Sequence, residues 1–389
     1  MIAIGSAVMR HIITEEFLRR ELDSCREKID RLLPRFQDCF PAANTEGLVY
    51  PAEYENFEWT TSFLSGMLWL LYEHTGDPDY LPVLRKHLDS FFHRVEDPGY
   101  LDTHDLGFLY SLSCYPAVLL RKDPRAEECF LKAAQALRRR YFPQAGIIQA
   151  WGDLEDPNNR GRMIIDCLLN LPLLYQAARL TGDRTYWEMA YSHAKQARKY
   201  LVRPDSTTYH TYYMDVDTGA PRFGRTAQGY SDSSCWARGQ AWGVYGFALS
   251  FRHTGDRSFL DTACKLLDYY LERLPGDGVC YWDLCFTQGD EPRDSSAAAI
   301  VCCGILELLK HLPLFHPRRE AYEEALVHTL RSLSERYTTW NLPDADGLLL
   351  HGVYSKPDGR GVDECTIWGD YYYMEALFRL LYGGCGYWY

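Results

Sequence analysis

The sequence predicts an all-α fold in which six helical hairpins close into a ring, an (α/α)6 barrel. Three observations lead to this prediction. Apolar residues recur at helical spacing through most of the 389 residues. The tripeptide Thr-Gly-Asp recurs at 75–77, 181–183 and 254–256, where the glycine can end one helix and the aspartate can cap the next. Connections inside the hairpins are short, whereas those between hairpins, such as 142–162 and 202–235, are long.

The expected helices follow one another without a linker that would separate two domains. Apolar residues lie among charges from Phe17 to Leu33, and an aromatic residue follows each Thr-Gly-Asp within the next helix's first turn. The spacing of apolar residues and the glycine and aspartate residues between the runs place helices at 17–33, 57–74, 80–93, 105–120, 126–141, 163–180, 185–201, 236–252, 258–274, 294–312, 319–337 and 363–381. We therefore expect one domain over residues 1–389. A solenoid of the same hairpins is the structural alternative.

Composition limits the class of partner. A net charge of −12 argues against nucleic acids and anionic membrane surfaces. The chain is 14% aromatic, with 29 tyrosines and 10 tryptophans, which suits a sugar-binding cleft and equally a large helical core. An anionic substrate would have to be held by local groups against the overall charge.

Cysteine and histidine spacing predicts neither disulfides nor a metal site. The 13 cysteines are odd in number and lack any C-x-x-C pair, so a reducing cytoplasm is the simpler expectation. The 12 histidines include no H-E-x-x-H. Residues Met1 to Met9 are short and lack a basic start, so neither a signal peptide nor a membrane span is expected there.

Unusual residues fall at the start of every second expected helix. These positions are Trp59, Asp105, Asp166, Arg238 with Trp242, Asp294 and the run 363–370. In a ring with alternate helices inside, these starts would gather around one cavity. Their summed amide dipoles would favour an anionic ligand.

Two of these residues are candidate acids. Asp105, in His-Asp-Leu-Gly-Phe, precedes an apolar run, so helix capping is its plain alternative role. Asp166 lies in the almost wholly apolar 163–170, where it is either structural or an acid with a shifted pKa. Two carboxylates on neighbouring inner helices would suit proton transfer to a sugar.

The stretch 224–246 is dense in glycine, tryptophan, arginine and glutamine. Serine and aspartate at 231–234 can cap the helix that follows, which would place Arg238 and Trp242 on one face of its first turns. An arginine at a helix start suggests a nearby anion, and a sugar acid would fit. The alternative is a buried tryptophan helix whose arginine reaches a carboxylate within the protein.

Three loop residues are weaker candidates. His210 lies in a β-forming segment, Gln228 in a turn, and Trp151 in a loop where it could stack on a sugar or pack within the protein.

Together these segments resemble the unsaturated glucuronyl hydrolases, glycoside hydrolase family 88. The resemblance rests on HDLGF, RMIIDCLLN, the His210 segment, QGYSDSSCWARGQAWGVYG, the Thr-Gly-Asp hairpins and IWGDYYYMEAL near the C-terminus. It covers nearly the whole chain, and it implies an (α/α)6 barrel.

The resemblance also implies roles and a reaction. Asp166 corresponds to the general acid/base and Asp105 to its carboxylate partner. The residues implied to bind the saccharide are His210, Gln228, Trp59, Trp151, Arg238 and Trp242. The implied substrate is a lyase-generated glycosaminoglycan di- or oligosaccharide with a C4=C5 double bond in its terminal uronic acid. Hydration of that bond would release a 4-deoxy keto-uronate without any cofactor.

One segment bears on sulfated substrates. Ser355 and Arg360 resemble a serine-serine-lysine pattern that some family members carry for sulfate, but Asp358 departs from it. A carboxylate would repel sulfate, so Asp358 argues against a preference for sulfated substrates. A solvated Pro-Asp-Gly turn is the plain alternative.

Three other functions stay open. An unsaturated rhamnogalacturonyl hydrolase would act on pectin fragments by the same chemistry. A sugar 2-epimerase on this barrel would need histidine bases, which are scarce at the inner-helix starts. A noncatalytic glycan-binding barrel is the third, and the sequence leaves open whether the chain forms a homo-oligomer.

Overall fold

The computed structural model describes residues 13–389, and within them twelve α-helices, α2 to α13, form six hairpins. The outer helices are α2 (Glu15–Leu32), α4 (Tyr80–Arg94), α6 (Pro124–Arg139), α8 (Arg184–Tyr200), α10 (Arg257–Glu272) and α12 (Arg319–Ser332). The inner helices are α3 (Ser62–Thr75), α5 (Leu106–Arg121), α7 (Leu171–Thr181), α9 (Ala237–Thr254), α11 (Ser295–His311) and α13 (Ile367–Tyr382). The segment Met1 to Met9 lies outside the described residues.

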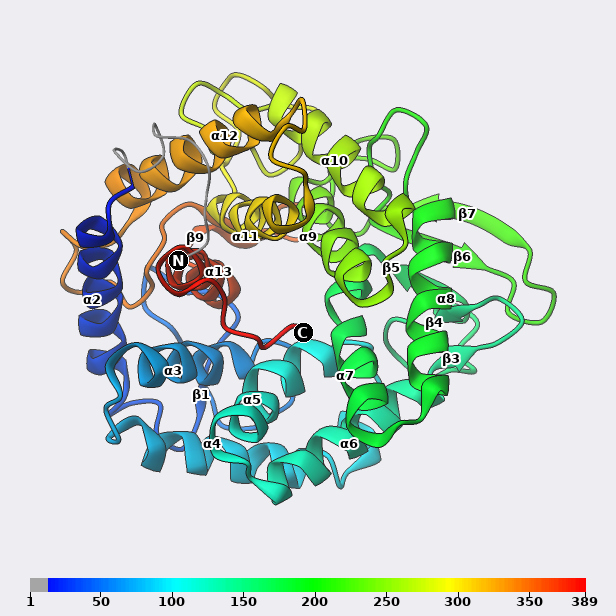
Figure 1. The fold of residues 1–389 in the computed structure, drawn as a ribbon, viewed down its shortest axis with the longest axis horizontal. Helices are drawn as coiled ribbons and strands as arrows, with labels where there is room; N and C mark the ends of the chain where they lie inside the picture. The colour runs from blue at the N-terminus through cyan, green and yellow to red at the C-terminus, as the bar shows by residue number, and fades with distance from the viewer. Residues whose placement is uncertain (1–12) are drawn as a thin grey trace.

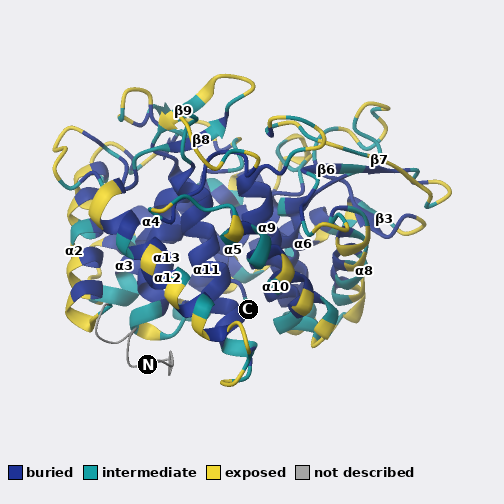
Figure 2. Ribbon diagram, turned by 90° about the horizontal axis from the view of Figure 1, so that it is seen from above, coloured by how far each residue is buried: buried dark blue, intermediate teal, exposed yellow. Residues whose placement is uncertain are grey.

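The inner helices close a ring, which confirms the (α/α)6 barrel. Each contacts its two neighbours, from α3 through α5, α7, α9 and α11 to α13, and α13 returns to α3 (Figure 1). The outer helices bury one stripe, whereas the inner ones are buried nearly all round; in α11 every residue from Ser295 to Leu309 is buried (Figure 2). Within residues 13–389, no helix has both the length and the apolar character needed to cross a bilayer.

Glycine and aspartate form the hairpin turns largely as predicted. Gly76, Gly182 and Gly255 end α3, α7 and α9 with left-handed backbone conformations, which glycine adopts without strain. Asp183 and Asp256 then cap α8 and α10 by accepting hydrogen bonds from backbone N–H groups. The expected capping by Asp77 is wrong, because α4 has Asp79 as its N-cap and no side chain caps it. These tight turns lie at the end of the barrel opposite the long loops (Figure 2).

Short strands occupy the long loops. They are β1 (Phe40–Pro41) with β2 (Ala52–Glu53), β3 (Tyr141–Phe142) with β4 (Ile147–Ile148), β8 (Gly352–Ser355) with β9 (Arg360–Glu364), and the three-stranded β5 (Arg162–Ile164), β6 (Thr211–Met214) and β7 (Pro221–Arg225). All pairings are antiparallel. The remaining elements are 3-10 turns η1 (Pro98–Tyr100) and η2 (Ile165–Leu169) and a π turn η3 (Leu333–Tyr337).

Several predicted helix bounds are wrong. The helix expected at 163–180 is a strand, a 3-10 turn and then α7, and the helix expected at 363–381 begins only at Ile367, after β9. Likewise α3 begins at Ser62 rather than at Phe57, and α12 ends at Ser332. In the first case the strand and the turn are as apolar as the helix that follows, so periodicity alone does not separate them. In the others a strand, turn or π segment directly adjoins the helix, where the sequence carries no sharp boundary.

The C-terminal segment fills the axis of the barrel. After α13 the chain turns at Gly383 and runs across the middle of the ring (Figure 1). Trp388 is fully buried, its ring lies 6.2 Å from that of Phe108, and its indole Nε1 donates to Glu375 at 2.8 Å. This segment thus supports the inner helices from the end opposite the long loops.

We expect Trp388→Ala to lower the free energy of unfolding by about 3–5 kcal/mol, because it opens a large cavity and leaves Glu375 without its indole donor. Urea denaturation followed by circular dichroism measures the change. Leu314→Ala is the control, because this side chain is 75% exposed and its truncation should cost under about 0.5 kcal/mol. Equal stability of the two variants would contradict a supporting role for the segment.

Candidate active site

The short turn η2 presents Asp166 at the loop end of the barrel. Strand β5 pairs with β6, with Ile164 opposite Thr211, and the Ile165 N–H donates to the His210 carbonyl at 3.1 Å. This pairing fixes the position of the turn that follows. Asp166 therefore extends from a 3-10 turn held by a sheet, and its predicted position in an α-helix is wrong.

Asp105 stands at the N-cap of α5 but does not cap it. Its carboxylate instead accepts a hydrogen bond from the Thr103 hydroxyl at 2.8 Å. The carbonyl of the Asn170 side chain accepts the Phe108 N–H at 2.7 Å. Gly107 permits this approach, because a Cβ there would lie 2.2 Å from the Asn170 backbone. The side chain of Asp105 is thereby free for the site.

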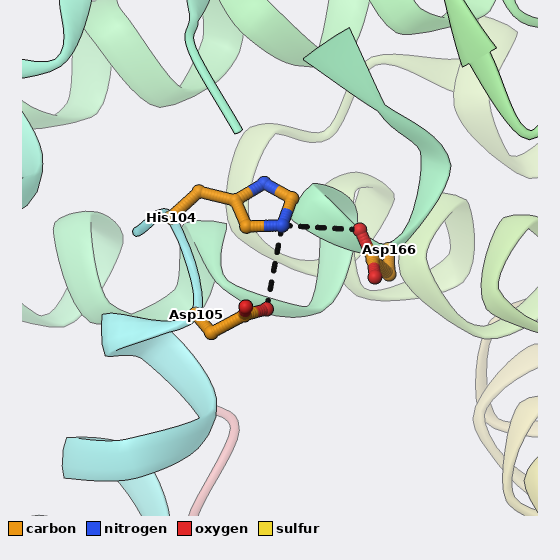
Figure 3. A group of neighbouring side chains, drawn as sticks. All are labelled: His104, Asp105 and Asp166. Atoms are coloured by element: carbon orange, nitrogen blue, oxygen red, sulfur yellow. Dashed lines mark ion pairs between the residues drawn. The ribbon is translucent and has the colours of Figure 1, made fainter. Parts of the chain in front are cut away.

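His104 joins the two predicted acids. Its Nε2 lies 3.3 Å from an oxygen of Asp105 and 3.3 Å from an oxygen of Asp166 (Figure 3). The imidazole side chain is fully buried, whereas the carboxylates of Asp105 and Asp166 are 12% and 20% exposed. The three side chains therefore form one charged cluster in which both carboxylates keep a limited opening to solvent.

Within the cluster, the pKa values of the two carboxyl groups shift in opposite directions. Burial raises the pKa of Asp166 to about 6, with a further contribution from Asp105 that opposes the effect of His104. Burial acts in the same direction on Asp105, but His104 and hydrogen bonds from Thr103 and Asn170 outweigh it and lower the pKa of that carboxyl. Asp166 is thus the group that can carry a proton near neutral pH, and Asp105 stays ionised.

Among the described residues, His104, Asp105 and Asp166 form a set whose ligand atoms could surround an ion, since these atoms lie within 4.8 Å of one another. Burial alone would lower the pKa of His104, but the two carboxylates raise it well above the usual value. The Nε2 of His104 lies 3.3 Å from a carboxylate oxygen of each aspartate, so the three side chains form an internal ion-pair cluster.

His210 and Gln228 lie together beside this cluster. The Nδ1 of His210 accepts the backbone N–H groups of Ala227 at 3.0 Å and Gln228 at 3.2 Å. Burial lowers the pKa of His210 to about 3, with a further contribution from Arg238. The ring is therefore neutral and keeps its proton on Nε2, where it can donate to a ligand.

Arg238 is already fully engaged within the protein. Its Nη1 lies 3.3 Å from the buried Asp294 and donates to the Val353 carbonyl, and its Nη2 donates to the Tyr354 carbonyl at 2.7 Å and to Gln228 Oε1 at 2.5 Å. Arg238 thus makes the contact that the alternative interpretation expects, with a carboxylate inside the protein. The expected capping by 231–234 is wrong, because α9 has Trp236 as its N-cap and no side chain caps it.

The three predicted tryptophans differ in exposure. Trp242 is 1% exposed and packs against Phe108 with ring centres 5.3 Å apart, so it belongs to the core. Trp59 is half-buried and donates from Nε1 to the Tyr354 hydroxyl at 2.9 Å. Trp151 is also half-buried and forms a β-bridge with Thr103, next to the His104 cluster. Trp59 and Trp151 keep exposed surface for a ligand.

The β8–β9 hairpin contains the residues predicted to contact sulfate. The Ser355 hydroxyl donates to Asp358 at 2.5 Å and is buried. Arg360 is exposed, and its guanidinium lies 4.0 Å from the centre of the Tyr354 ring. The Ser355 hydroxyl therefore already donates its proton to Asp358 and does not offer it to a sulfate group.

His104 and Asn170 are the site residues that sequence reasoning missed. Both stand inside motifs already singled out, because His104 precedes Asp105 and Asn170 follows Asp166 by four residues. Asn170 Nδ2 approaches Asp105 at 3.5 Å and so links the two motifs. Because His104 and His210 are both buried at the site, a scarcity of histidine does not argue against an epimerase.

Comparison with known proteins identifies the family. A model of glycosyl hydrolase family 88 matches residues 29–383. An unsaturated chondroitin disaccharide hydrolase of Streptococcus pneumoniae is 46% identical over 369 residues, covering 95% of this chain and 93% of that protein.

Solved structures agree with this match. The unsaturated glucuronyl hydrolase of Bacillus sp. GL1, described as responsible for the degradation of glycosaminoglycan, is 44% identical with a TM-score of 0.92, and the match covers 96% of this chain and 99% of that one. A variant of the Streptococcus agalactiae unsaturated glucuronyl hydrolase, complexed with dGlcA-GalNAc6S, is 41% identical with a TM-score of 0.86 and coverage of 96% and 94%. The chain therefore belongs to glycosyl hydrolase family 88, as its motifs predicted.

Proposed function

We propose that this protein is an unsaturated glucuronyl hydrolase that hydrates the C4=C5 double bond of the terminal uronic acid in lyase-generated glycosaminoglycan oligosaccharides. The observation that carries the proposal is the pair of carboxylates, Asp105 and Asp166, each 3.3 Å from His104 Nε2 at the loop end of the barrel. Burial there raises the pKa of Asp166 to about 6, whereas His104 holds that of Asp105 below its usual value. Protonation of an alkene carbon needs such a proton donor near neutral pH. The names of the relatives support the same substrate class.

The reaction balances with water as the sole co-reactant. Asp166 donates its proton to C4, and positive charge develops at C5 and the ring oxygen, where the ionised Asp105 stabilises it. Water adds its oxygen to C5 and returns one proton to the Asp166 carboxylate. The hemiketal at C5 then opens to a ketone, which leaves a hemiacetal at C1. This hemiacetal breaks down to an aldehyde and releases the shortened sugar.

The other predicted residues surround this centre in the proposal. His210 Nε2 and Gln228 would contact the reacting uronate, and the exposed parts of Trp59 and Trp151 would stack on sugar rings. Ser355 and Arg360 would lie toward the neighbouring sugar. The roles of Arg238 and Trp242 become indirect, because both are enclosed by protein.

Ultraviolet absorbance of the conjugated double bond tests the proposal directly. The protein is mixed with the unsaturated hyaluronan disaccharide, with unsaturated chondroitin and heparin disaccharides that carry or lack sulfate, and with unsaturated rhamnogalacturonan fragments, all in the presence of a chelator. We expect absorbance to fall on at least one glycosaminoglycan substrate. Loss of absorbance only on unsaturated rhamnogalacturonan fragments would establish the pectin activity instead, and no loss on any substrate would overturn both.

The pH dependence of kcat/KM follows from the same two carboxyls. Because the protonated Asp166 is the reactive form, activity should fall above about pH 6, by about tenfold per pH unit once the group is ionised. The lowered pKa of Asp105 places the acid limb below the usual aspartate range, since this group must stay charged. Stopped-flow rates from about pH 4 to 9 measure the alkaline limb, and the acid limb should not appear within this range, because the usual aspartate pKa is about 3.9 and that of Asp105 is lower. A rate that keeps rising through pH 8 would contradict Asp166 as the acid.

We also propose a cytoplasmic location. All 13 cysteines are free, and eleven of them are buried, which suits a reducing compartment. Cell fractionation with an antibody against the protein tests this proposal, and recovery of the protein outside the cytoplasm would contradict it.

A further inference from the structure

His104 is held rigidly between the two motifs of the site. Its backbone N–H donates to the Ala150 carbonyl at 2.6 Å, and the adjacent Thr103 pairs with Trp151 in a β-bridge. The side chain is fully buried, and the next residue, Asp105, begins α5 as its N-cap. The imidazole thus has little freedom to leave the space between the two carboxylates.

The position of Nε2 makes His104 a shared counter-ion. It lies at 3.3 Å from each carboxylate, and the two carboxylates offer oxygens within 4.8 Å of each other (Figure 3). Two buried carboxylates at this separation cannot both be ionised without a compensating cation. Arg238 also acts electrostatically on Asp166, but it is already paired with Asp294.

We propose that His104 is a positioning residue that holds Asp105 and Asp166 together through one ring nitrogen and supplies the positive charge that lets Asp105 stay ionised beside a proton-bearing Asp166. It contacts neither the alkene carbons nor the attacking water and acts through the two acids. The kinetic part of this inference rests on the proposed function, whereas the charge of the ring is measurable without any substrate.

The charges of His104, Asp105 and Asp166 balance one another in the proposed state. With His104 protonated, Asp105 ionised and Asp166 neutral, the cluster carries no net charge. The other titratable groups that face the ring are Cys167 on η2, His193 on α8 and His210 before β6, and burial disfavours the charged form of each. The charged groups nearby also include Arg238, which acts on Asp166, and Arg94 and Arg140, which act on Asp105. Each arginine is already engaged by other protein groups, so loss of the His104 charge would raise the pKa of both carboxyls.

Nuclear magnetic resonance of the whole protein tests the ring charge directly. With 15N-labelled histidine, the His104 signals are assigned by their loss in His104→Gln or by their selective shift in Asp166→Asn. We expect both ring nitrogens to stay protonated at pH 7.5, about one unit above the usual histidine pKa of 6.5. A neutral His104 ring at that pH would overturn the inference, even if His104→Gln fails to fold.

The variant His104→Gln then tests the effect on the acids. We expect the Asp166 carboxyl, followed by 13C and assigned by its absence in Asp166→Asn, to titrate about one unit higher than in the wild type. The alkaline limb of kcat/KM should move the same way, and kcat at the wild-type optimum should fall about tenfold or more with little change in KM.

The matched control is His87→Gln, which removes another fully buried imidazole, bonded to Ser65 and the Phe36 carbonyl. It should lower stability and leave the alkaline limb of the pH profile in place. Equal shifts in both variants, or none in His104→Gln, would overturn the inference. Failure of the wild type on every unsaturated uronide would overturn the proposed function instead, and the resonance measurements would still decide the charge of His104.

Discussion

Asp166→Asn should reduce hydration of the unsaturated uronide by about 10³-fold or more while the fold is kept. The amide fills the same space in η2 but can neither donate a proton to C4 nor take one from water. Because burial penalises the charge of Asp166, the amide should also leave stability unchanged or slightly raised. Absorbance at saturating substrate measures kcat, and thermal unfolding measures stability.

The control for this variant is Asp217→Asn. This carboxylate is 79% exposed and pairs with Arg160 on the surface, so its loss should leave kcat within experimental error. Retention of more than about a tenth of the wild-type rate in Asp166→Asn would show that another group delivers the proton. Binding of the disaccharide to the variant, followed by calorimetry, separates lost chemistry from lost binding.

The helical hairpins are predictable because their signals are local. Glycine at the end of one helix and aspartate at the start of the next act through their own backbone neighbours, so Gly182 and Asp183 behave as the sequence indicates. The run 163–170 fails because strand β5 and turn η2 are as apolar as the helix that follows. What makes this run a strand and a turn is pairing with β6, which lies about fifty residues further along the chain.

Helix capping likewise depends on residues that are distant in the sequence. A residue such as Asp105 has the chemistry of an N-cap, but Asn170, brought close by the Gly107 contact, supplies the oxygen to α5 instead. The serines at 231–234 likewise bond to one another and to Asp283 rather than to the start of α9. The sequence shows which hydrogen bonds a side chain is able to make near its own position. Which of them forms depends on the partners that the rest of the fold brings close.

Site residues at predicted helix starts could be found from the sequence. Residues whose role depends on their distance to side chains far away in the sequence could not. Asp105 and Asp166 could be singled out as carboxylates at unusual positions. The importance of His104 comes from its distance to both, which arises only when η2 and the start of α5 meet at the loop end of the barrel. Arg238 was predicted from the same reasoning about helix starts, but the anion that it meets is Asp294.

Arg238→Met should lower the free energy of unfolding by about 3–5 kcal/mol, because it removes the ion-pair partner of the buried Asp294, which then keeps only its hydrogen bonds from Ser296 and Ala297. The carbonyls of Val353 and Tyr354 on β8 also lose their donor, so the hairpin that carries Ser355 should loosen. Urea denaturation measures the stability, and hydrogen exchange of the amides of β8 and β9 measures the loosening.

The control and the partner variant separate structure from binding. Arg160→Met breaks a surface pair with Glu155 and Asp217 and should cost at most about 1 kcal/mol. Adding Asp294→Asn to Arg238→Met removes the stranded charge, so the double variant should be more stable than the sum of the single changes predicts. If Arg238→Met instead raised KM and left stability and β8 exchange unchanged, the guanidinium would serve the substrate. Its four protein partners argue for the first outcome, because an arginine bound to a carboxylate, an amide oxygen and two carbonyls has already used most of its donors.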